Sequence, residues 1–523
     1  MLAEAAYYLR MTAGLVQRMR SPVLDPEPAI RDQMANRESR FLETVRRVIY
    51  GNPANPFHEM LRLAGCAYED LEAGVGKDGI ESTMAKLHQA GVWLAHDELK
   101  CKKLIHRSGR HIPCDVESFL NPLVHGYWRG SSSGSRGKPL PGRQSPQAQA
   151  YRECHMQMVH REFGTRGRQV AIVRQILPVL NGINTSIRGS RMGLPIHRWY
   201  VPGFGGARAL HYRSVTQVLI REARLLGAHV PSPEYLPEND FLPVARWIAE
   251  NRGNVLFAGS VSMAVRVAGA ALEKGLDIGG ALFWVGGEAL TDPKRAVIEQ
   301  TGASVFPRYN STDVGAVGYS CRQMKTGNCV HLFEEALAVH SYRRQAPYSD
   351  VEVNSLLFTT LLPFASRVLL NVEIDDAGLI EPASCDCVFS RLGFRRQVRN
   401  IFSYGKLTGQ GTTLLGGDML RLMEETLPAR FGGRPGDFQL VEKEGARQTG
   451  ITLRVSPRLR LSHPEDVREV FLKELTHFVG GTPSAAIWRH SQAVEVVMEE
   501  PLATRTGKVH ALHLLFGESE AVR

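Results

Sequence analysis

The sequence lacks any apolar run of the roughly 18–20 residues that a helix needs to cross a membrane. Its N-terminus carries interspersed arginines and no clean apolar core, which predicts an amphipathic helix rather than a secretory signal. Cysteine is scarce, with 8 residues in 523, and this excludes a disulfide-stapled scaffold. We therefore expect a cytoplasmic protein with no membrane partner, in which clustered cysteines are candidates for a metal site.

Charge is plentiful but is not concentrated in one region. Lys and Arg number 63 against 53 Asp and Glu, and the formal net charge of +10 favours anionic partners such as nucleotide phosphates. The basic residues form only short clusters, and no nucleic-acid-binding module or long basic arm is recognisable. We therefore expect no nucleic-acid partner, and the sequence leaves a homodimer open.

The chain is long enough for two or three domains. Residues 1–105 show apolar residues at three- and four-residue spacing, which predicts helices. Helices then alternate with buried strands, which indicates parallel strands covered by helices. We expect a large α/β domain over residues 1–404, with mostly parallel sheets and its nucleotide and acyl sites within 127–390. A hairpin, a helix and a strand predict a small mobile α+β domain over 405–523.

The stretch YWRGSSSGSRGKPLP, residues 127–141, reads either as a flexible linker or as a phosphate-binding loop. A standard P-loop requires Gly at position 132 and a hydroxyl at position 139, where Ser132 and Pro139 stand. The kinase-type loop is therefore excluded. The choice between a linker and another kind of phosphate loop depends on the rest of the chain.

Four later motifs favour the phosphate loop. A Gly286-Gly287-Glu288 turn follows one strand, and Tyr-Asn-Ser-Thr-Asp-Val-Gly (309–315) ends another. Two acids stand in a turn at 375–376, and TRTGK ends at Lys508. In this order the motifs resemble those of the adenylate-forming superfamily of acyl-CoA synthetases, peptide-synthetase adenylation domains and luciferases. The chain is most similar to the phenylacetate–CoA ligase branch, over roughly residues 55–510.

The resemblance implies an AMP-forming acid–thiol ligase. A carboxylate would attack the α-phosphorus of Mg²⁺-bound ATP, and a thiol, usually that of coenzyme A, would then displace AMP. Two alternatives stay open, namely a carrier-protein, amine or other acceptor, and a degenerate adenylate-binding protein without ligase activity. By family analogy the substrate is a small-molecule carboxylic acid, with an aromatic acid suggested by Trp199, Tyr200 and Phe204.

The resemblance also implies a role for each motif. The Ser/Gly loop would wrap the ATP phosphates, Gly286–Glu288 would line the adenine edge, and Asp376 would accept the ribose hydroxyls. Tyr309 would border the adenine. The implied nucleotide-binding residues are Ser132, Ser133, Gly134, Ser135, Gly137, Lys138, Gly286, Gly287, Glu288, Tyr309, Asn310, Ser311 and Asp376.

The implied catalytic residues are Thr312, Asp313 and Lys508. Thr312 would bind an α-phosphate oxygen, Asp313 would ligate Mg²⁺, and Lys508 would bridge the carboxylate and the phosphate. The family usually has Glu where Asp313 stands. The family's hinge arginine is also missing, because Lys406 or Gln410 occupies that place.

Two groups of cysteines flank these motifs. Cys321, Cys329 and His331 follow the first acid-bearing turn, and Cys385 and Cys387 follow the second. Because both turns must converge on one nucleotide, the two groups can meet in space, and four thiolate and imidazole donors suit structural Zn²⁺. We favour Cys321, His331, Cys385 and Cys387 as ligands. Reduced loop cysteines without a metal are the alternative.

Overall fold

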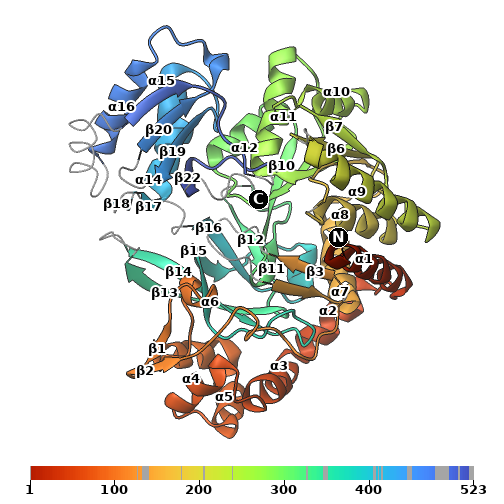
Figure 1. The fold of residues 1–523 in the computed structure, drawn as a ribbon, viewed down its shortest axis with the longest axis vertical. Helices are drawn as coiled ribbons and strands as arrows, with labels where there is room; N and C mark the ends of the chain where they lie inside the picture. The colour runs from red at the N-terminus through yellow and green to blue at the C-terminus, as the bar shows by residue number, and fades with distance from the viewer. Residues whose placement is uncertain are drawn as a thin grey trace.

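The structure is a computed structural model that describes residues 2–126, 128–131, 141–177, 179–203, 207–237, 239–325, 328–345, 352–403, 408–409, 412–413, 416–444, 450–477, 494–504 and 507–516. It comprises N-terminal helices, a twelve-stranded sheet with its covering helices, and a smaller C-terminal part with its own sheet (Figure 1). Within these ranges, no helix is long and apolar enough to cross a membrane.

The N-terminal region is helical, as its apolar spacing predicts. Its elements are α1 (Leu2–Arg20), α2 (Pro26–Ala35), α3 (Arg37–Val45), η1 (Arg46–Tyr50), α4 (Pro56–Leu63), α5 (Tyr68–Gln89) and α6 (His96–Leu99). Phe41, Ile49 and Phe57 are fully buried, so these helices share the large core of the protein. The short hairpin β1 (Ile105–Arg107) and β2 (Arg110–Ile112) ends the region.

The twelve-stranded sheet joins a parallel half to an antiparallel half. The parallel strands, in spatial order, are β7 (Pro233–Leu236), β6 (Arg198–Pro202), β5 (Gln169–Val173), β8 (Val255–Ser260), β9 (Leu282–Gly286) and β10 (Ser304–Ser311). The antiparallel strands continue with β11 (Gly315–Tyr319), β12 (Val330–Leu332), β16 (Arg396–Ser403), β15 (Val372–Pro382), β14 (Glu352–Thr360) and β13 (Leu337–Gln345). The predicted α/β class is confirmed, and the antiparallel half is an addition that the sequence analysis did not foresee.

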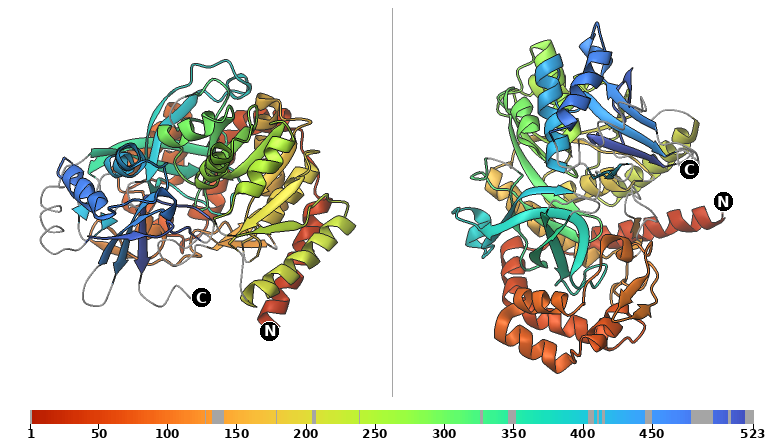
Figure 2. Two further views of the ribbon diagram at one scale, coloured as in Figure 1. Left: turned by 90° about the horizontal axis from the view of Figure 1, so that it is seen from above. Right: turned by 90° about the vertical axis from the view of Figure 1, so that its left-hand side faces the viewer.

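Helices cover both faces of the parallel half. Every residue of β8 is buried, as expected for a strand enclosed on two sides. The core on one face includes α7 (Pro146–Phe163), α8 (Asn181–Arg191) and α9 (Ala207–Leu225), and α1 lies against α9 (Figure 2). The core on the other face is formed with α10 (Leu242–Glu250), α11 (Val261–Lys274) and α12 (Asp292–Glu299).

The Ser/Gly stretch is flanked by two short strands, β3 (Trp128–Ser131) and β4 (Pro141–Gln144). They pair antiparallel, with Ser131 opposite Pro141. Because its two ends lie side by side, the stretch connects a hairpin instead of separating two domains. The predicted phosphate-binding residues Ser132, Ser133, Gly134, Ser135, Gly137 and Lys138 lie outside the described residues.

The C-terminal part has a four-stranded sheet in the order β21 (Val494–Met498), β20 (Gly450–Val455), β19 (Phe438–Glu444) and β22 (Leu512–Phe516). The predicted hairpin is the antiparallel pair β19–β20, and the predicted helix is α16 (Glu465–Leu475). Phe471 and Leu472 of α16 pack into a separate apolar core. Its other helices are α14 (Gly416–Arg421), η3 (Leu422–Thr426) and α15 (Leu427–Phe431). The boundary at residue 405 stays a prediction.

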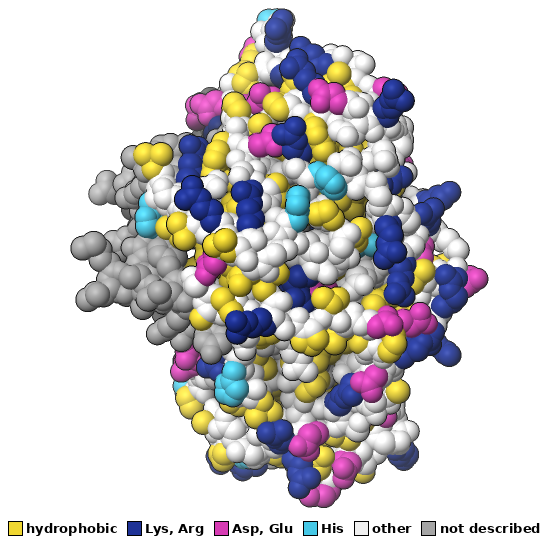
Figure 3. Space-filling view, turned by 90° about the vertical axis from the view of Figure 1, so that its right-hand side faces the viewer, with side chains coloured by type: hydrophobic (Ala, Val, Ile, Leu, Met, Phe, Trp, Pro, Cys, Tyr) yellow, Lys and Arg dark blue, Asp and Glu magenta, His cyan; other side chains and the backbone are white. Residues whose placement is uncertain are grey.

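Ion pairs, one of them buried and two at the surface, join the C-terminal part to the large sheet's helices. Lys294 of α12 is 2.5 Å from Glu424 of η3, and both side chains are buried. Glu273 at the end of α11 accepts from Arg434 (3.1 Å) and Arg458 (2.9 Å). The described surface in Figure 3 shows Lys and Arg side chains interleaved with acids over the height of that face, in agreement with their scatter along the sequence.

Candidate active site

Two of the predicted motifs meet at one end of the sheet. β9 and β10 are parallel neighbours with Gly286 opposite Arg308, so the Gly-Gly-Glu turn and the Tyr309–Asp313 segment follow the same edge. Gly287 has a φ of +86°, a left-handed conformation that glycine adopts without strain. The carboxyl ends of parallel strands are where α/β proteins commonly bind ligands.

Lys508 comes to this edge from the C-terminal part. A Cβ added at Gly287 would lie 3.2 Å from Lys508 Nζ, so the glycine leaves room for the lysine. The backbone around Lys508 is fixed by a tight turn, in which the Lys508 N–H donates to Thr504 Oγ1 (3.1 Å). The next residue, Val509, donates its N–H to Ser262 Oγ (3.1 Å), and Ser262 in turn bonds to Glu288. The structure thus brings Lys508 and the Gly286–Glu288 turn together.

Tyr309 and Asp376 are in direct contact, although 67 residues separate them. The Tyr309 hydroxyl donates to Asp376 Oδ2 at 2.6 Å. Burial and the Asp376 charge raise the pKa of Tyr309 well above its usual value, so the phenol stays protonated and acts as a donor. Asp375 has a φ of +60°, a left-handed conformation that is uncommon for residues other than glycine.

Asp313 is surrounded by cations that the sequence analysis missed. Lys100, directly after α6, places Nζ 2.8 Å from Asp313 Oδ1. His96 of α6 lies between two acids, with Nε2 3.8 Å from Asp313 Oδ2 and Nδ1 3.1 Å from Asp375 Oδ2. Arg367 donates to the Asp313 backbone carbonyl at 3.2 Å. No sequence motif marks these residues, because they act from a one-turn helix and a loop.

These neighbours set the charge state of Asp313. Its side chain is 11% exposed, and burial alone would raise the pKa of its carboxyl. Hydrogen bonds and charges from His96 and Lys100 instead lower that pKa to about 2. Asp313 is therefore a carboxylate matched by an ammonium group. Thr312 beside it is exposed, and its carbonyl accepts from Arg367 (3.3 Å).

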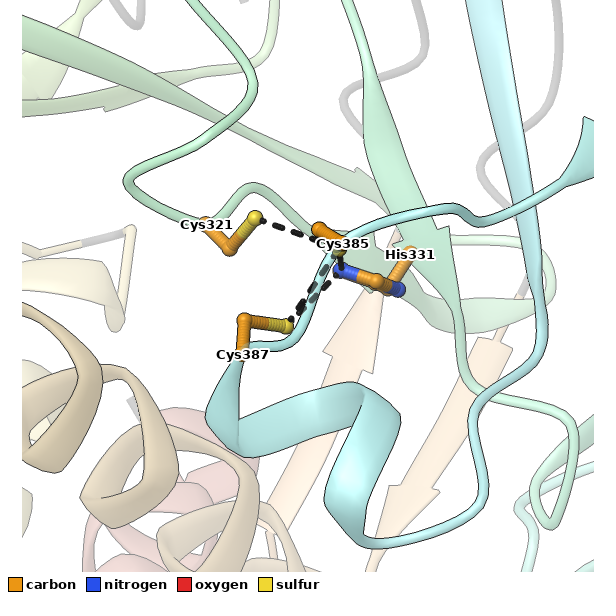
Figure 4. Close-up of side chains that lie close together, drawn as sticks. All are labelled: Cys321, His331, Cys385 and Cys387. Atoms are coloured by element: carbon orange, nitrogen blue, oxygen red, sulfur yellow. Dashed lines mark hydrogen bonds between the residues drawn. The ribbon is translucent and has the colours of Figure 1, made fainter.

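The four favoured cysteine and histidine side chains converge at a second place in the fold. Cys321 follows β11, His331 lies in β12, and Cys385 and Cys387 precede α13 (Val388–Arg391). Their ligand atoms all lie within 4.8 Å of one another, and the side chains point toward a common centre (Figure 4). Cys329 is buried but does not belong to this cluster.

Two of the residues that suggested an aromatic acid do not line an accessible site. Trp199 is fully buried and Tyr200 is 2% exposed, so both are part of the core instead of offering a surface to an aromatic acid. Phe204, together with the hinge candidates Lys406 and Gln410, lies outside the described residues. Trp199 and Tyr200 therefore give no support to an aromatic substrate.

Replacing Lys100 by Met is expected to lower the free energy of unfolding by about 2–4 kcal/mol at pH 7, because the Asp313 carboxylate loses its ammonium partner in a nearly buried site. The pKa of Asp313 is held below its usual 3.8, so this stabilisation is present above that pH and is lost as the pH falls toward about 2. Thermal unfolding measured from pH 7 to pH 3 should show the two proteins converging.

The matched control is Lys103→Met, which removes an exposed lysine 3.9 Å from Asp97 and should change little at any pH. A stability gap between wild type and Lys100→Met that stays constant down to pH 3 would contradict the assignment.

Comparison with known proteins gives one line of support for the fold. No protein-family model matches the chain, and no curated protein matches it in sequence. Among solved structures, the chain is similar to 2-hydroxyisobutyryl-CoA ligase in its postadenylation state. The complex with 2-HIB-AMP has a TM-score of 0.53 and that with R3-HIB-AMP 0.54, each at 13% identity over 91% of this chain and 88% of that chain. At this identity the likeness shows the fold alone, and the chain therefore shares its fold with an acyl-CoA ligase, as the resemblance in sequence implies.

Proposed function

We propose that this protein activates a carboxylic acid with ATP to give an acyl adenylate and pyrophosphate, and then transfers the acyl group to a thiol, with coenzyme A as the acceptor. The observation that carries this proposal is the position of Lys508, which reaches from the C-terminal part to the Gly286–Gly287 turn. A protein that bound the adenylate without forming it would not need a lysine side chain at this turn. The shared fold is the second support.

In the first step, a carboxylate oxygen of the acid forms a bond to the α-phosphorus, and the bond from that phosphorus to the bridging oxygen of pyrophosphate breaks. Two anions converge in this step, so the main catalytic requirement is positive charge at the reacting atoms. The Lys508 ammonium, beside Gly287, would offset that repulsion. No protein nucleophile is required.

The nucleotide would bind across the ends of β9 and β10 and beside Asp376 within β15. Asp376 would accept ribose hydroxyls, and the hydrogen bond from Tyr309 would hold its carboxylate in position. The Gly286–Glu288 turn would border the adenine edge. Thr312, which is exposed at the strand end, would donate to an α-phosphate oxygen. These roles are the ones predicted from sequence.

Magnesium would enter as the counter-ion of ATP. The surroundings of Asp313 consist of Lys100, His96 and Arg367, which are cationic groups or potential cations in place of the further oxygen ligands that Mg²⁺ prefers. The residues around this carboxylate therefore do not fit a directly bound Mg²⁺. That role of Asp313 stays a prediction.

In the second step, the thiol sulfur attacks the acyl carbonyl carbon, and the acyl–phosphate oxygen bond breaks to release AMP. This attack does not need Lys508 between two anions. The C-terminal part would therefore rotate away, which requires breaking the Lys294–Glu424 pair and the Ser262–Val509 hydrogen bond. Both contacts lie on the surface by which the C-terminal part meets α11 and α12.

The first test is a pyrophosphate-release screen over aryl, fatty, hydroxy and amino acids, with and without coenzyme A. At least one acid should release pyrophosphate in an ATP-dependent manner and yield a thioester when coenzyme A is present. A panel with no release above background would contradict the ligase. Release without any thioester would keep the adenylation and reject coenzyme A as the acceptor.

Replacing Lys508 by Ala should slow pyrophosphate release roughly 10²–10³-fold, because its charge acts only as the two anions meet. Thioester formation from a synthetic acyl adenylate should stay close to the wild-type rate. The matched control is Lys473→Ala, which removes an exposed lysine of α16 in the same part of the chain. Equal losses in both half-reactions would assign Lys508 a structural role.

We also propose that Cys321, His331, Cys385 and Cys387 hold a structural Zn²⁺. Tetrahedral zinc with Zn–S bonds of about 2.3 Å places its sulfurs about 3.8 Å apart. The Cys321–Cys385 and Cys385–Cys387 sulfur separations are 3.8 and 3.7 Å, and His331 Nε2 is 3.2 Å from the sulfurs of Cys385 and Cys387. All four ligands come from protein side chains and leave no open coordination position, as is typical of a structural zinc that joins distant segments of the fold.

Protein purified without added metal should contain about one zinc per chain by elemental analysis. Cys385→Ser should lose most of this zinc and lower the thermal midpoint by on the order of 5 °C, because it opens a link between β12 and the segment before α13. Cys66→Ser, which removes a cysteine outside the cluster, should keep the metal. Metal-free protein with unchanged stability would contradict the proposal.

A further inference from the structure

Four arginines lie near the carboxyl ends of β5 and β10, which β8 and β9 separate in the sheet, on the face that α7 and α8 cover. Arg174 directly follows β5 and Arg308 lies in β10, whereas Arg152 belongs to α7 and Arg188 to α8. Arg188 is buried and the other three are half-buried. None of the four was singled out by a sequence motif, and none has a role in the steps described above.

Arg308 runs along the sheet toward the Gly286–Gly287 turn. Its guanidinium carbon is 4.8 Å from the centre of the Trp284 ring. Its side chain crosses Gly286 so closely that a Cβ there would lie 3.0 Å from Nε. Gly286 therefore faces Arg308, and the neighbouring Gly287 faces Lys508. Two cations thus flank one turn at the end of β9.

These arginines have no carboxylate partners among the residues that the structure describes. Arg174 donates only to the carbonyl of Val173, at 3.4 Å. Arg188 bonds to neutral groups, Gln149 Oε1 (3.1 Å) and Met156 Sδ (3.5 Å). The Nε atoms of Arg152 and Arg188 are buried and have no acceptor.

The nearby carboxylate of Glu153 already forms ion pairs with two other arginines. Glu153 of α7 bonds to Arg18 and, at 3.0 Å, to Arg191. Its negative charge is therefore already balanced by two further cations, and it does not neutralise the four arginines. A charge taken out of water is costly unless an opposite charge compensates it, so several arginines held together here call for an anion that the described chain does not supply.

The charges of neighbouring arginines act on the pKa values of Arg174, Arg188 and Arg308, in addition to the larger effect of burial. Burial lowers the pKa of Arg174 well below its usual value, and the charges of Arg308, Arg152 and Arg188 lower it further. Burial likewise lowers the pKa of Arg308 to about 10 and that of Arg188 to about 9. An anion placed among them would relieve this repulsion.

We propose that the acid activated by this protein is a dicarboxylate, with its reacting carboxylate at Lys508 and its second carboxylate held by Arg174 and Arg308. This inference rests on the proposed function. Planar guanidinium groups bind carboxylates with paired hydrogen bonds, which a hydrocarbon end of the same shape cannot form. Arg152 and Arg188 add positive potential behind the two contacting arginines. The burial of Trp199 and Tyr200 agrees with a charged substrate in place of an aromatic one.

The test compares acids that are matched in length and differ in the second charge. Pyrophosphate release is measured for succinate against butyrate, glutarate against pentanoate, and isophthalate against benzoate. We expect kcat/KM to be roughly 10- to 100-fold higher for the dicarboxylate of at least one pair. A preference for the monocarboxylate in every pair would overturn the inference and leave the proposed function intact.

Two variants locate the second carboxylate. In Arg174→Met and Arg308→Met, the ratio of kcat/KM between the paired acids should fall toward one, while the KM for ATP stays unchanged. Thermal stability should not fall, because each change removes repulsion between like charges. The matched control is Arg62→Met, an exposed arginine paired with Glu59. A rise confined to the KM for ATP would assign the arginines to the nucleotide and overturn the inference.

Binding without ATP separates this inference from the proposed function. A thermal-shift titration should show stabilisation by the dicarboxylate and not by its monocarboxylate partner, and the effect should weaken in high salt. Stabilisation without pyrophosphate release would keep the anion site and reject the ligase. The absence of both effects would overturn both proposals. Because this titration uses the wild-type protein, it tests the dicarboxylate site even if a variant fails to fold.

Discussion

The register of β10 is the constraint on which the rest of the molecule depends. β10 is parallel to β9 and antiparallel to β11, so it is the strand at which the two halves of the large sheet join. Because side chains alternate between faces along a strand, a slip of one residue would exchange the positions of Arg308 and Tyr309. The metal-binding candidate depends on the same strand, since Tyr319 of β11 pairs with both Arg308 of β10 and His331 of β12.

The interior carries an imbalance of charge that fits a protein handling anions. Buried acids are well matched, as at Glu373, which accepts from Tyr342 (2.9 Å), Arg344 (2.7 Å) and Ser355 (2.6 Å). The arginines beside β5 and β10 are not matched in this way by the described chain. The positive potential that results suits ATP, pyrophosphate, coenzyme A and a charged acid, all of which are anions. These unmatched arginines contribute to the formal net charge of +10.

Sequence motifs predicted which residues meet, and they failed where no motif exists. The contact of Tyr309 with Asp376 and the convergence of Cys321, His331, Cys385 and Cys387 both follow from short patterns that keep their spacing. Lys100 reaches Asp313 across 213 residues from a single helical turn, and such a long-range pair leaves no local signal. The antiparallel half left no clear signal at the end of β13 either, because residues 340–345, HSYRRQ, do not alternate between apolar and polar types, although their burial alternates in the structure.

The pair formed by Lys294 and Glu424 has a kinetic consequence. It is buried and short, and it joins the part that carries Lys508 to α12, which covers the large sheet. If the C-terminal part rotates between the two half-reactions, each turnover must expose this pair to water and later dehydrate it again. Every 1.4 kcal/mol by which the contact favours the docked arrangement makes the undocked one tenfold rarer. The strength of a single ion pair, remote from the reacting atoms, would then set how long the enzyme dwells between making the adenylate and using it.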